Sequence, residues 1–344
     1  MSQAAAAPLD LTALDAWMAR TVPGYAGPLS AEKFAGGQSN PTFRLTTPGD
    51  AYVLRRKPPG TLLKSAHAVD REFRVQHALA GTAVPVARMV ALCEDEDVIG
   101  SMFYVMEHVE ARHFDDPRTP ELSREERAAV FDAMNATVAA IHMVDLGAVG
   151  LADYGRPGNY FARQLGRWST QYRASETRHI ADMEALIAWL EANLPEDDGR
   201  RTLVHGDFRL DNLLFHRSRP EVKAVLDWEL STLGHPFADL AAILMQWRLE
   251  PGTTGRGLAG VDRAAAGIPT DTAFVEAYCA RTGIDAVPHL NVYLAFCFFR
   301  MAGILQGIEK RRIDGNASNP QRAAAAGALV PLYAAMGLEA ACHG

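Results

Sequence analysis

Cysteine is scarce in this sequence, and the few cysteines lie far apart. Only 4 of the 344 residues are cysteine, and no two form a C-x-x-C pair (Cys93, Cys279, Cys297 and Cys342). Zinc sites and the disulfide frameworks of small secreted domains need closely and regularly spaced cysteines. We therefore expect reduced thiols, no cysteine-bound metal and a cytoplasmic location.

Positive charge and membrane-directing segments are also scarce. Lys and Arg total 34 against 41 Asp and Glu, a net charge of -7 at pH 7, so the surface repels phosphate backbones and nucleic acid is a poor partner. Residues 1–10 lack a basic region followed by a long apolar run, and the most apolar stretch, 292–299, stops at Arg300. We expect no signal peptide and no membrane helix.

The composition that remains is that of a folded globular protein. Hydrophobic residues make up 48% and charged residues 22% of the chain, close to the averages for globular domains. At about 100–200 residues per domain, a chain of 344 residues is expected to form two domains or two lobes around a cleft. A small binding module and a disordered chain are both disfavoured.

The pattern of apolar residues predicts an α+β protein. Strand-like runs separated by turn residues fill 31–56, a helix is predicted over 66–79, and two strands follow within 86–105. From Ser123, which forms a capping-box pattern with Glu126, the sequence mainly favours helices. We expect a small antiparallel β-sheet lobe with one helix at 1–106 and a larger, mainly helical lobe at 107–344.

The clearest chemical signal lies in two nearby segments, 203–212 and 224–229. The first contains His-Gly-Asp and ends in Asp-Asn, and the second ends in Asp-Trp-Glu. In kinases, one Asp orients the attacking hydroxyl, an Asn five residues later takes a magnesium, and an Asp after a short hairpin bridges the metals. Asp207, Asn212 and Asp227 fit these three positions.

This residue set suits the chemistry because the γ-phosphoryl group carries spread negative charge, which hard cations held by oxygen ligands neutralise. The alternative is that the Asp and Asn residues only cap helices and form turns. Their joint spacing between apolar strands favours the functional interpretation. We interpret His205 as a structural brace of the loop.

These residues resemble the aminoglycoside phosphotransferase and choline kinase superfamily, whose hallmark is H-G-D followed by N and a later D. The resemblance spans about residues 30–310. The run Tyr-Val-Leu-Arg-Arg-Lys-Pro-Pro-Gly at 52–60 and the Asp-Trp-Glu ending are most similar to kinase-like domains associated with acyl-CoA dehydrogenases. The resemblance implies a two-lobed protein-kinase-like fold that uses ATP and Mg²⁺, with nucleotide bound by the first lobe and the acceptor by the second.

The resemblance also implies a phosphate-covering loop at Gly36, Gly37, Gln38, Ser39 and Asn40. Glycine lets the backbone N–H groups of such a loop approach phosphates closely. The alternative is a plain hairpin turn between two strands.

On the third strand, Arg55 takes the place of the usual phosphate-contacting lysine, with Glu72 on the following helix as its partner. A guanidinium can hold phosphate and pair with a carboxylate, but it is not equivalent to an ammonium. Arg56 and Lys57 therefore stay open as alternatives. An exposed strand charge and a solvated helix face are the non-functional interpretations of Arg55 and Glu72.

The strand at 103–106 should lead into the hinge between the lobes. Backbone groups at Glu107, His108 and Val109 would then contact adenine, whereas Met106 is equally well explained as core packing.

Arginines cluster in the predicted helical lobe. Arg163 and Arg167 are four residues apart and share a helix face, within a stretch that has five arginines against one glutamate (residues 156–178). A polycationic aminoglycoside would instead need carboxylates. We therefore expect an anionic acceptor, and the resemblance implies a hydroxyacyl-CoA or a hydroxy acid and a functional link to an acyl-CoA dehydrogenase. Plain solvated helix faces are the alternative.

The predicted function is an ATP- and Mg²⁺-dependent phosphotransferase acting on the hydroxyl of a small molecule, with Asp207 as the catalytic base and Asn212 and Asp227 as metal ligands. One alternative is an aminoglycoside or choline-type kinase. Another is a non-catalytic pseudokinase that binds an acyl-CoA dehydrogenase, although the intact set of three residues argues against it.

Overall fold

The computed structural model describes residues 9–34, 40–58, 68–252, 257–316 and 319–342. They belong to two compact units, the first made of Met1–Phe114, Asp145–Leu151 and Leu210–Ser231 and the second of Asp115–Val144, Ala152–Arg209 and Thr232–Gly344. Most residues of each unit belong to the corresponding predicted lobe, but two later segments group with the first unit. One of them, Leu210–Ser231, contains Asn212 and Asp227.

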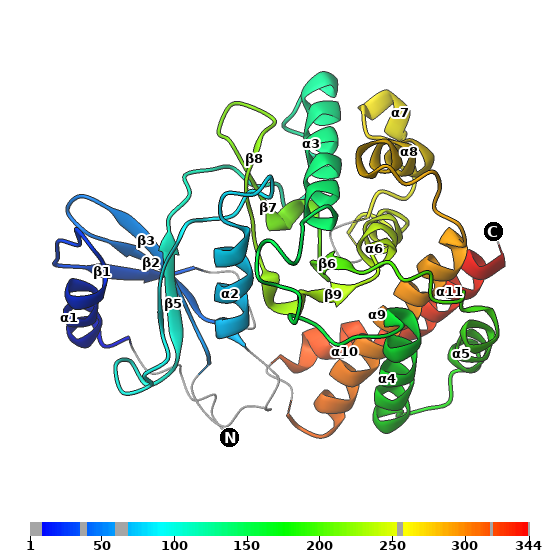
Figure 1. Cartoon of the computed structure of the whole chain (residues 1–344). Coiled ribbons are helices and arrows are strands. Elements are labelled where there is room, and N and C mark those ends of the chain that lie inside the picture. The colour runs from blue at the N-terminus through cyan, green and yellow to red at the C-terminus, as the bar shows by residue number, and fades with distance from the viewer. Residues whose placement is uncertain (1–8, 35–39, 59–67, 253–256, 317–318, 343–344) are drawn as a thin grey trace. The chain divides into compact units, whose positions relative to one another are not determined.

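A five-stranded antiparallel sheet forms the centre of the first unit (Figure 1). Its strand order is β1-β2-β3-β5-β4, which places β3 in the middle. Successive side chains of a strand point to opposite faces, so Tyr52 and Leu54 enter one apolar cluster and Val53 enters the other. The strands are β1 (Ser30–Lys33), β2 (Thr42–Thr46), β3 (Ala51–Arg56), β4 (Met89–Cys93) and β5 (Phe103–Glu107).

Two helices cover the two faces of this sheet (Figure 1). Helix α1 (Leu11–Thr21) packs Trp17 edge-on against Phe103, with ring centroids 4.8 Å apart. Helix α2 (Val69–Leu79) contributes Val69 to the cluster on the opposite face. Both faces of the sheet are therefore buried. The face on which a charged residue of β3 lies thus decides which residues it can contact.

The late segment of the first unit is a short hairpin flanked by two single turns. Strands β7 (Leu213–Phe215) and β8 (Val222–Val225) pair antiparallel, between η1 (Leu210–Asn212) and η2 (Trp228–Leu230). The hairpin is tied to the rest of this unit by hydrogen bonds from Val225 N–H to the Pro85 carbonyl, 2.9 Å, and between Arg112 and Phe215.

The second unit is mainly helical and is organised around α9 (Leu290–Ile313). Helix α9 contacts α4, α5, α6, α10 and α11. Strands β6 (Thr202–Val204) and β9 (Thr232–Gly234) pair antiparallel in the same unit. The other helices are α3 (Arg124–His142), α4 (Tyr160–Ser175), α5 (Ala181–Asn193), α6 (Phe237–Trp247), α7 (Arg263–Ala266), α8 (Asp271–Thr282), α10 (Pro320–Ala328) and α11 (Val330–Cys342).

The structure contains two features that the sequence predicts. The Ser123 hydroxyl accepts from Glu126 N–H and the Glu126 carboxylate accepts from Ser123 N–H, which is the predicted capping box at the start of α3. The α+β class, with an antiparallel sheet preceding a mainly helical unit, is confirmed.

Among the described residues, two segments are apolar and long enough to cross a membrane by length and composition, α9 and 320–342. The first is a mostly buried core helix of the second unit, and the second consists of two helices, α10 and α11. Core helices of soluble proteins have the same length and hydropathy, so this finding is weak support for a membrane span.

Two glycines of the second unit provide a paired test of how closely its segments pack. A Cβ at Gly155 would lie 2.5 Å from the backbone nitrogen of Leu233, whereas a Cβ at Gly166, inside α4, has no atom within 4 Å. We expect Gly155→Ala to lower the free energy of unfolding by about 1–3 kcal/mol through overpacking. Gly166→Ala should raise it by about 0.5–1 kcal/mol by restricting the unfolded chain. Urea unfolding of both variants checks this, and equal stability of the two would contradict the packing.

Candidate functional site

Arg55 and Glu72 meet in the first unit, as the sequence pairing predicts. Arg55 lies on β3, on the face that meets α2, and Glu72 lies in the first turn of α2. The Arg55 Nε atom is 2.8 Å from Glu72 Oε2, and the two side chains are 13% and 1% exposed. The contact is an ion pair without hydrogen-bond alignment of the Nε–H group.

Two further donors hold the Glu72 carboxylate. Asn40 Nδ2 donates to Oε1 over 2.7 Å, and the Tyr104 hydroxyl donates to Oε2 over 3.2 Å. Burial raises the pKa of Glu72 to about 7, although the neighbouring Arg55 cation acts to lower it. Asn40, predicted as part of the phosphate loop, thus braces Glu72. The rest of that predicted loop, Gly36, Gly37, Gln38 and Ser39, lies outside the described residues.

Arg55 also contacts two carboxylates that follow β8. Its Nη2 group donates to Asp227 Oδ1 over 2.9 Å and lies 3.5 Å from Glu229 Oε2. Burial acts to lower the pKa of Arg55, but Glu72 and the other two carboxylates outweigh it and raise that pKa. Glu229 was not among the predicted site residues, although it belongs to the Asp-Trp-Glu ending that drew attention to Asp227.

The two alternatives to Arg55 point elsewhere. Arg56 is 1% exposed, donates to the Ile99 carbonyl over 3.3 Å and lies 5.7 Å from the centre of the Phe43 ring. Because neighbouring side chains of a strand alternate, Arg56 faces away from Glu72. Lys57 continues the strand with a backbone hydrogen bond to Met102, 3.0 Å. Arg55 is therefore the basic residue of this run that meets Glu72.

The β7–β8 hairpin places Asn212 beside the residue that precedes Asp227. Leu213 pairs with Val225, and Leu226 N–H donates to the Asn212 carbonyl over 2.8 Å. Asp227 follows with φ 64° and ψ 60°, a left-handed conformation that costs about 1–3 kcal/mol for a non-glycine residue. The buried Trp228 indole anchors the turn by donating to the Val225 carbonyl, 3.0 Å. Both predicted metal ligands therefore lie at one end of the hairpin.

The predicted catalytic loop in the second unit follows β6. Gly206 has a φ of 85°, which glycine adopts without strain. The Asp207 carboxylate is 30% exposed and lies 3.2 Å from the Arg209 guanidinium, and Asp207 N–H points at His205 Nδ1 over 3.3 Å. His205 is fully buried, as expected of a brace. Arg209 was not predicted, although it lies two residues after Asp207 in the same motif.

A buried carboxylate on α6 holds the backbone of this loop. Asp239 Oδ2 accepts from His205 N–H over 2.7 Å, and Oδ1 accepts from Gly206 N–H over 2.8 Å. Burial acts to raise the pKa of Asp239, but the hydrogen bonds and charge of its neighbours, His142 first, outweigh it and lower that pKa. The sequence analysis missed Asp239, and the signal that could have found it is a single charged residue in a mostly apolar helix.

The predicted hinge residues end the sheet of the first unit. The Glu107 carboxylate accepts from Arg88 N–H over 3.0 Å, and His108 N–H donates to the Ala51 carbonyl over 3.2 Å. Val109 packs against the apolar cluster that includes Val53. An adenine contact at Glu107 and Val109 stays a prediction.

The predicted acceptor residues on α4 have different surroundings. The Arg163 guanidinium donates to three carbonyls of the preceding loop, 156–158, so its contacts are those of a loop cap. Arg167 lies 5.6 Å from the centre of the Trp168 ring, and Arg300 of α9 lies 5.9 Å from the same ring. Arg300 also donates to the Gly206 carbonyl over 3.3 Å, which links it to the catalytic loop.

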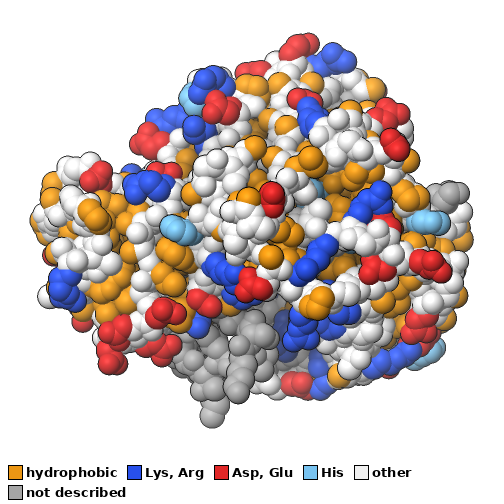
Figure 2. All heavy atoms as spheres, in the orientation of Figure 1, with side chains coloured by type: hydrophobic (Ala, Val, Ile, Leu, Met, Phe, Trp, Pro, Cys, Tyr) orange, Lys and Arg blue, Asp and Glu red, His pale blue; other side chains and the backbone are white. Residues whose placement is uncertain are grey.

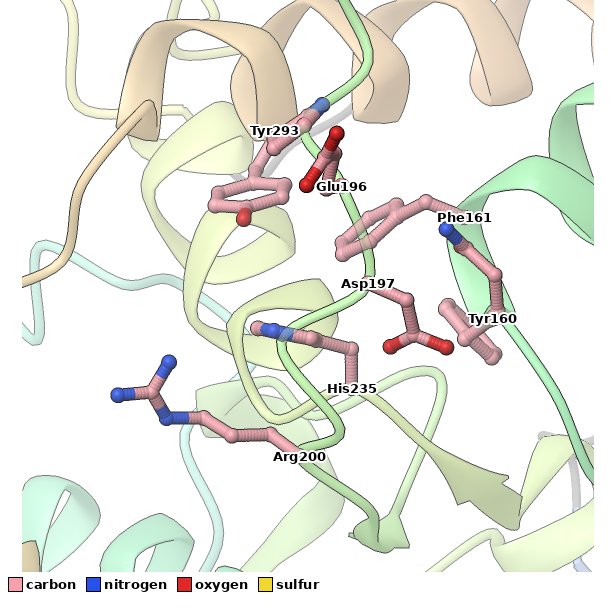
Figure 3. Close-up of a pocket in the computed structure, with 9 residues that line it drawn as sticks. Tyr160, Phe161, Glu196, Asp197, Arg200, His235 and Tyr293 are labelled. Carbon is pink, nitrogen blue, oxygen red and sulfur yellow. The ribbon is translucent and has the colours of Figure 1, made fainter.

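A small cavity elsewhere in the second unit is lined by none of the predicted site residues (Figure 3). Its volume is about 10 Å³, room for about one water molecule. Aromatic and acidic side chains form its walls, together with Arg200 and His235. A nucleotide does not fit this cavity.

The face of the molecule in Figure 2 carries charges of both signs. Basic and acidic side chains are interspersed over the face in Figure 2. One group of possible metal ligands, Glu176, His179 and Glu184, lies at the corner between α4 and α5. Glu184 is already paired with Arg173, and this group is separate from Asn212 and Asp227.

Comparison with known proteins gives one consistent result. The model of the "Phosphotransferase enzyme family" matches residues 30–287. Acyl-CoA dehydrogenase family member 10 of Mus musculus is 48% identical over 294 residues, which cover 85% of this chain. The chain spans only 27% of that relative's length.

Solved structures are similar along nearly the whole chain. A candidate aminoglycoside phosphotransferase from Ralstonia eutropha has 52% identity and a TM-score of 0.89, and the match covers 97% of this chain and 99% of that one. The aminoglycoside phosphotransferase APH(4)-Ia, solved with AMP-PNP and hygromycin B, has 16% identity and a TM-score of 0.64, and covers 97% and 100%. The second likeness shows the fold alone.

The Arg55–Glu72 pair can be tested by a double-mutant cycle. Arg55→Met should lower the free energy of unfolding by about 3–5 kcal/mol, because it leaves Glu72 buried without its cation. Adding Glu72→Gln should recover more than about 1 kcal/mol, since an uncharged amide needs no counter-charge. Urea unfolding measures both. Arg88→Met, at an exposed pair with Glu107, is the control and should change stability by less than about 1 kcal/mol. No recovery in the double variant would contradict the pairing.

Proposed function

Because the chain belongs to the phosphotransferase enzyme family, as the motifs at 203–229 predicted, we propose that it transfers the γ-phosphoryl group of ATP to the hydroxyl of a small molecule with Mg²⁺ as cofactor. The observation that carries the proposal is the contact of Arg55 with both Glu72 and Asp227. It joins a basic strand residue, its helix partner and the predicted metal ligand in one cluster of the first unit.

In this proposal, Arg55 holds phosphate oxygens while Glu72, fixed by Asn40 and Tyr104, orients its guanidinium. Asn212 and Asp227 supply a carboxamide and a carboxylate oxygen, the ligand chemistry that Mg²⁺ prefers. Bound Mg²⁺ would neutralise charge on the phosphates. The complex of APH(4)-Ia with AMP-PNP supports ATP as the donor.

Asp207 is the proposed general base. Its carboxylate takes the proton of the acceptor hydroxyl while that oxygen attacks the γ-phosphorus, and the bond from the γ-phosphorus to ADP breaks. The Arg209 guanidinium lies 3.2 Å from Asp207 and restricts the orientation of its carboxylate. Asp239 fixes the backbone of the two residues before Asp207, so the carboxylate is presented by a braced loop.

We further propose that the acceptor is an anionic hydroxy compound, a hydroxy acid or a hydroxyacyl-CoA. Support comes from Arg300, which contacts both the loop at Gly206 and the Trp168 ring, and from Arg167 on the same ring. The name of the mouse relative, an acyl-CoA dehydrogenase family member, points to acyl-CoA chemistry. An aminoglycoside acceptor is the second candidate, favoured by the likeness to the Ralstonia eutropha protein.

Asp207→Asn tests the proposed base. It should lower kcat for Mg²⁺-dependent phosphate transfer by at least about a hundredfold, the contribution expected of a positioned base, while ATP binding stays nearly unchanged. The assay couples ADP release across aminoglycosides, choline, sugars and hydroxyacyl-CoAs. Glu221→Gln, an equal change of charge at an exposed position, is the control. Turnover that survives Asp207→Asn would exclude this base, and no turnover of the unaltered chain with any acceptor would favour a non-catalytic binding protein.

Arg167→Ala tests the charge of the acceptor. If the guanidinium contacts the acceptor, KM for a hydroxy acid or hydroxyacyl-CoA should rise about tenfold or more, equivalent to about 1.4 kcal/mol. Arg217→Ala, an exposed arginine paired with Glu110, should leave KM unchanged. Steady-state kinetics decide between them. Efficient phosphorylation of kanamycin by the unaltered chain would contradict an anionic acceptor.

A further inference from the structure

We propose that Tyr278 and His142 are positioning residues, which hold Asp239 in place and through it the backbone of the catalytic loop. The inference rests on the proposed function, because the loop carries Asp207. Tyr278 Oη lies 2.7 Å from His142 Nδ1, and His142 Nε2 lies 3.3 Å from Asp239 Oδ2. With the bonds from Asp239 to the loop, this is a continuous series of hydrogen bonds from α8 through α3 and α6 to the loop.

Burial makes this series necessary. Tyr278, His142 and Asp239 are 0%, 5% and 1% exposed. An ionised carboxylate without water needs donors on its oxygens, since an unpaired buried charge is strongly unfavourable. Asp239 obtains them from the N–H groups of His205 and Gly206 and from His142.

The direction of the hydrogen bonds follows from the acceptor at their end. A carboxylate only accepts, so His142 Nε2 carries a proton and donates it to Asp239. In the tautomer that is protonated only at Nε2, Nδ1 accepts from the Tyr278 hydroxyl. The two rings stand nearly perpendicular, at 79° with centroids 5.6 Å apart. Tyr278 therefore fixes both the tautomer and the orientation of His142.

The two carboxylate oxygens of Asp239 accept from different donors. Oδ1 accepts from Gly206 N–H, and Oδ2 accepts from both His205 N–H and His142 Nε2–H. Without the His142 contact, the carboxylate would be free to rotate away from the loop amides. Since a misplacement of about 1 Å can lower a rate about a hundredfold, loosening these amides should affect the chemical step at Asp207.

A second buried hydrogen bond between the same helices provides a matched control. Asn135 of α3 donates from Nδ2 to the Phe274 carbonyl of α8 over 2.8 Å, and it is 1% exposed. Its Oδ1 accepts from the Arg281 guanidinium of α8 over 2.7 Å. The side-chain amide of Asn135 therefore connects α3 to α8. Asn135→Ala therefore weakens the packing of α3 on α8 without removing a donor from Asp239.

Amide hydrogen exchange of the loop tests the proposal without any activity. In His142→Leu, protection of the His205 and Gly206 amides should fall at least about tenfold relative to amides of α3 and α8. Tyr278→Phe, which keeps the ring, should lower it severalfold. His142→Gln, which keeps an N–H donor, should restore most of it. Loop protection in Asn135→Ala should match the unaltered chain relative to the same helices.

Mg²⁺-dependent ATP turnover provides the functional readout. We expect His142→Leu to lower kcat about tenfold or more at unchanged KM for ATP, with rescue by His142→Gln. If the unaltered chain turns over no ATP, the proposed function fails while the exchange measurement still decides the positioning role. Unchanged loop protection in both His142→Leu and Tyr278→Phe would overturn the proposal. Equal loosening of the loop in Asn135→Ala would also overturn it, because the effect would then be general destabilisation.

Discussion

Buried carboxylates that must be surrounded by donors are the constraint on which both units depend. Glu72 in the first unit is held by Arg55, Asn40 and Tyr104. Asp239 in the second is held by two backbone amides and His142. Because an unpaired buried charge is so unfavourable, each carboxylate forces several elements into one arrangement. The proposed metal ligand Asp227 and the proposed base Asp207 are more exposed. Asp227 contacts Arg55, the partner of Glu72, and Asp207 directly follows the backbone that Asp239 holds.

The two carboxylates are compensated by different means. Glu72 faces a guanidinium that is shared with Asp227 and Glu229, and this is the cation that we propose to hold phosphate oxygens. Asp239 has hydrogen-bond donors from the backbone and from His142, and its role is to fix a loop. The first arrangement suits the binding of charged groups, whereas the second suits rigidity, because its partners are buried main-chain and ring atoms with little freedom to move.

Much of the fold and part of the site could be predicted from local patterns. Alternating apolar residues predicted the sheet, and the capping box at Ser123 predicted the start of α3, because both depend on neighbours along the chain. The spacing of Asp207, Asn212 and Asp227 indicated phosphoryl transfer, and the family is confirmed. The sequence alone could not show which of Arg55, Arg56 and Lys57 meets Glu72, because that depends on which face of β3 packs against α2. Asp239, Arg209 and Glu229, which contact the predicted site residues or their backbone, were not among the predicted site residues.

The sequence by itself determined the α+β class, the order of strands and helix over residues 31–105 and the motif shared with the family. These follow from periodicity, capping and spacing, which act over a few residues. Only the tertiary structure decided which carboxylates are buried and which donors reach them. Arg55 and Asp227 are 172 positions apart, and His142 and Tyr278 are 136 apart. Such pairs form because desolvated charges and polar atoms must find partners in the packed interior, and one sequence alone does not show which distant residues the packing brings together.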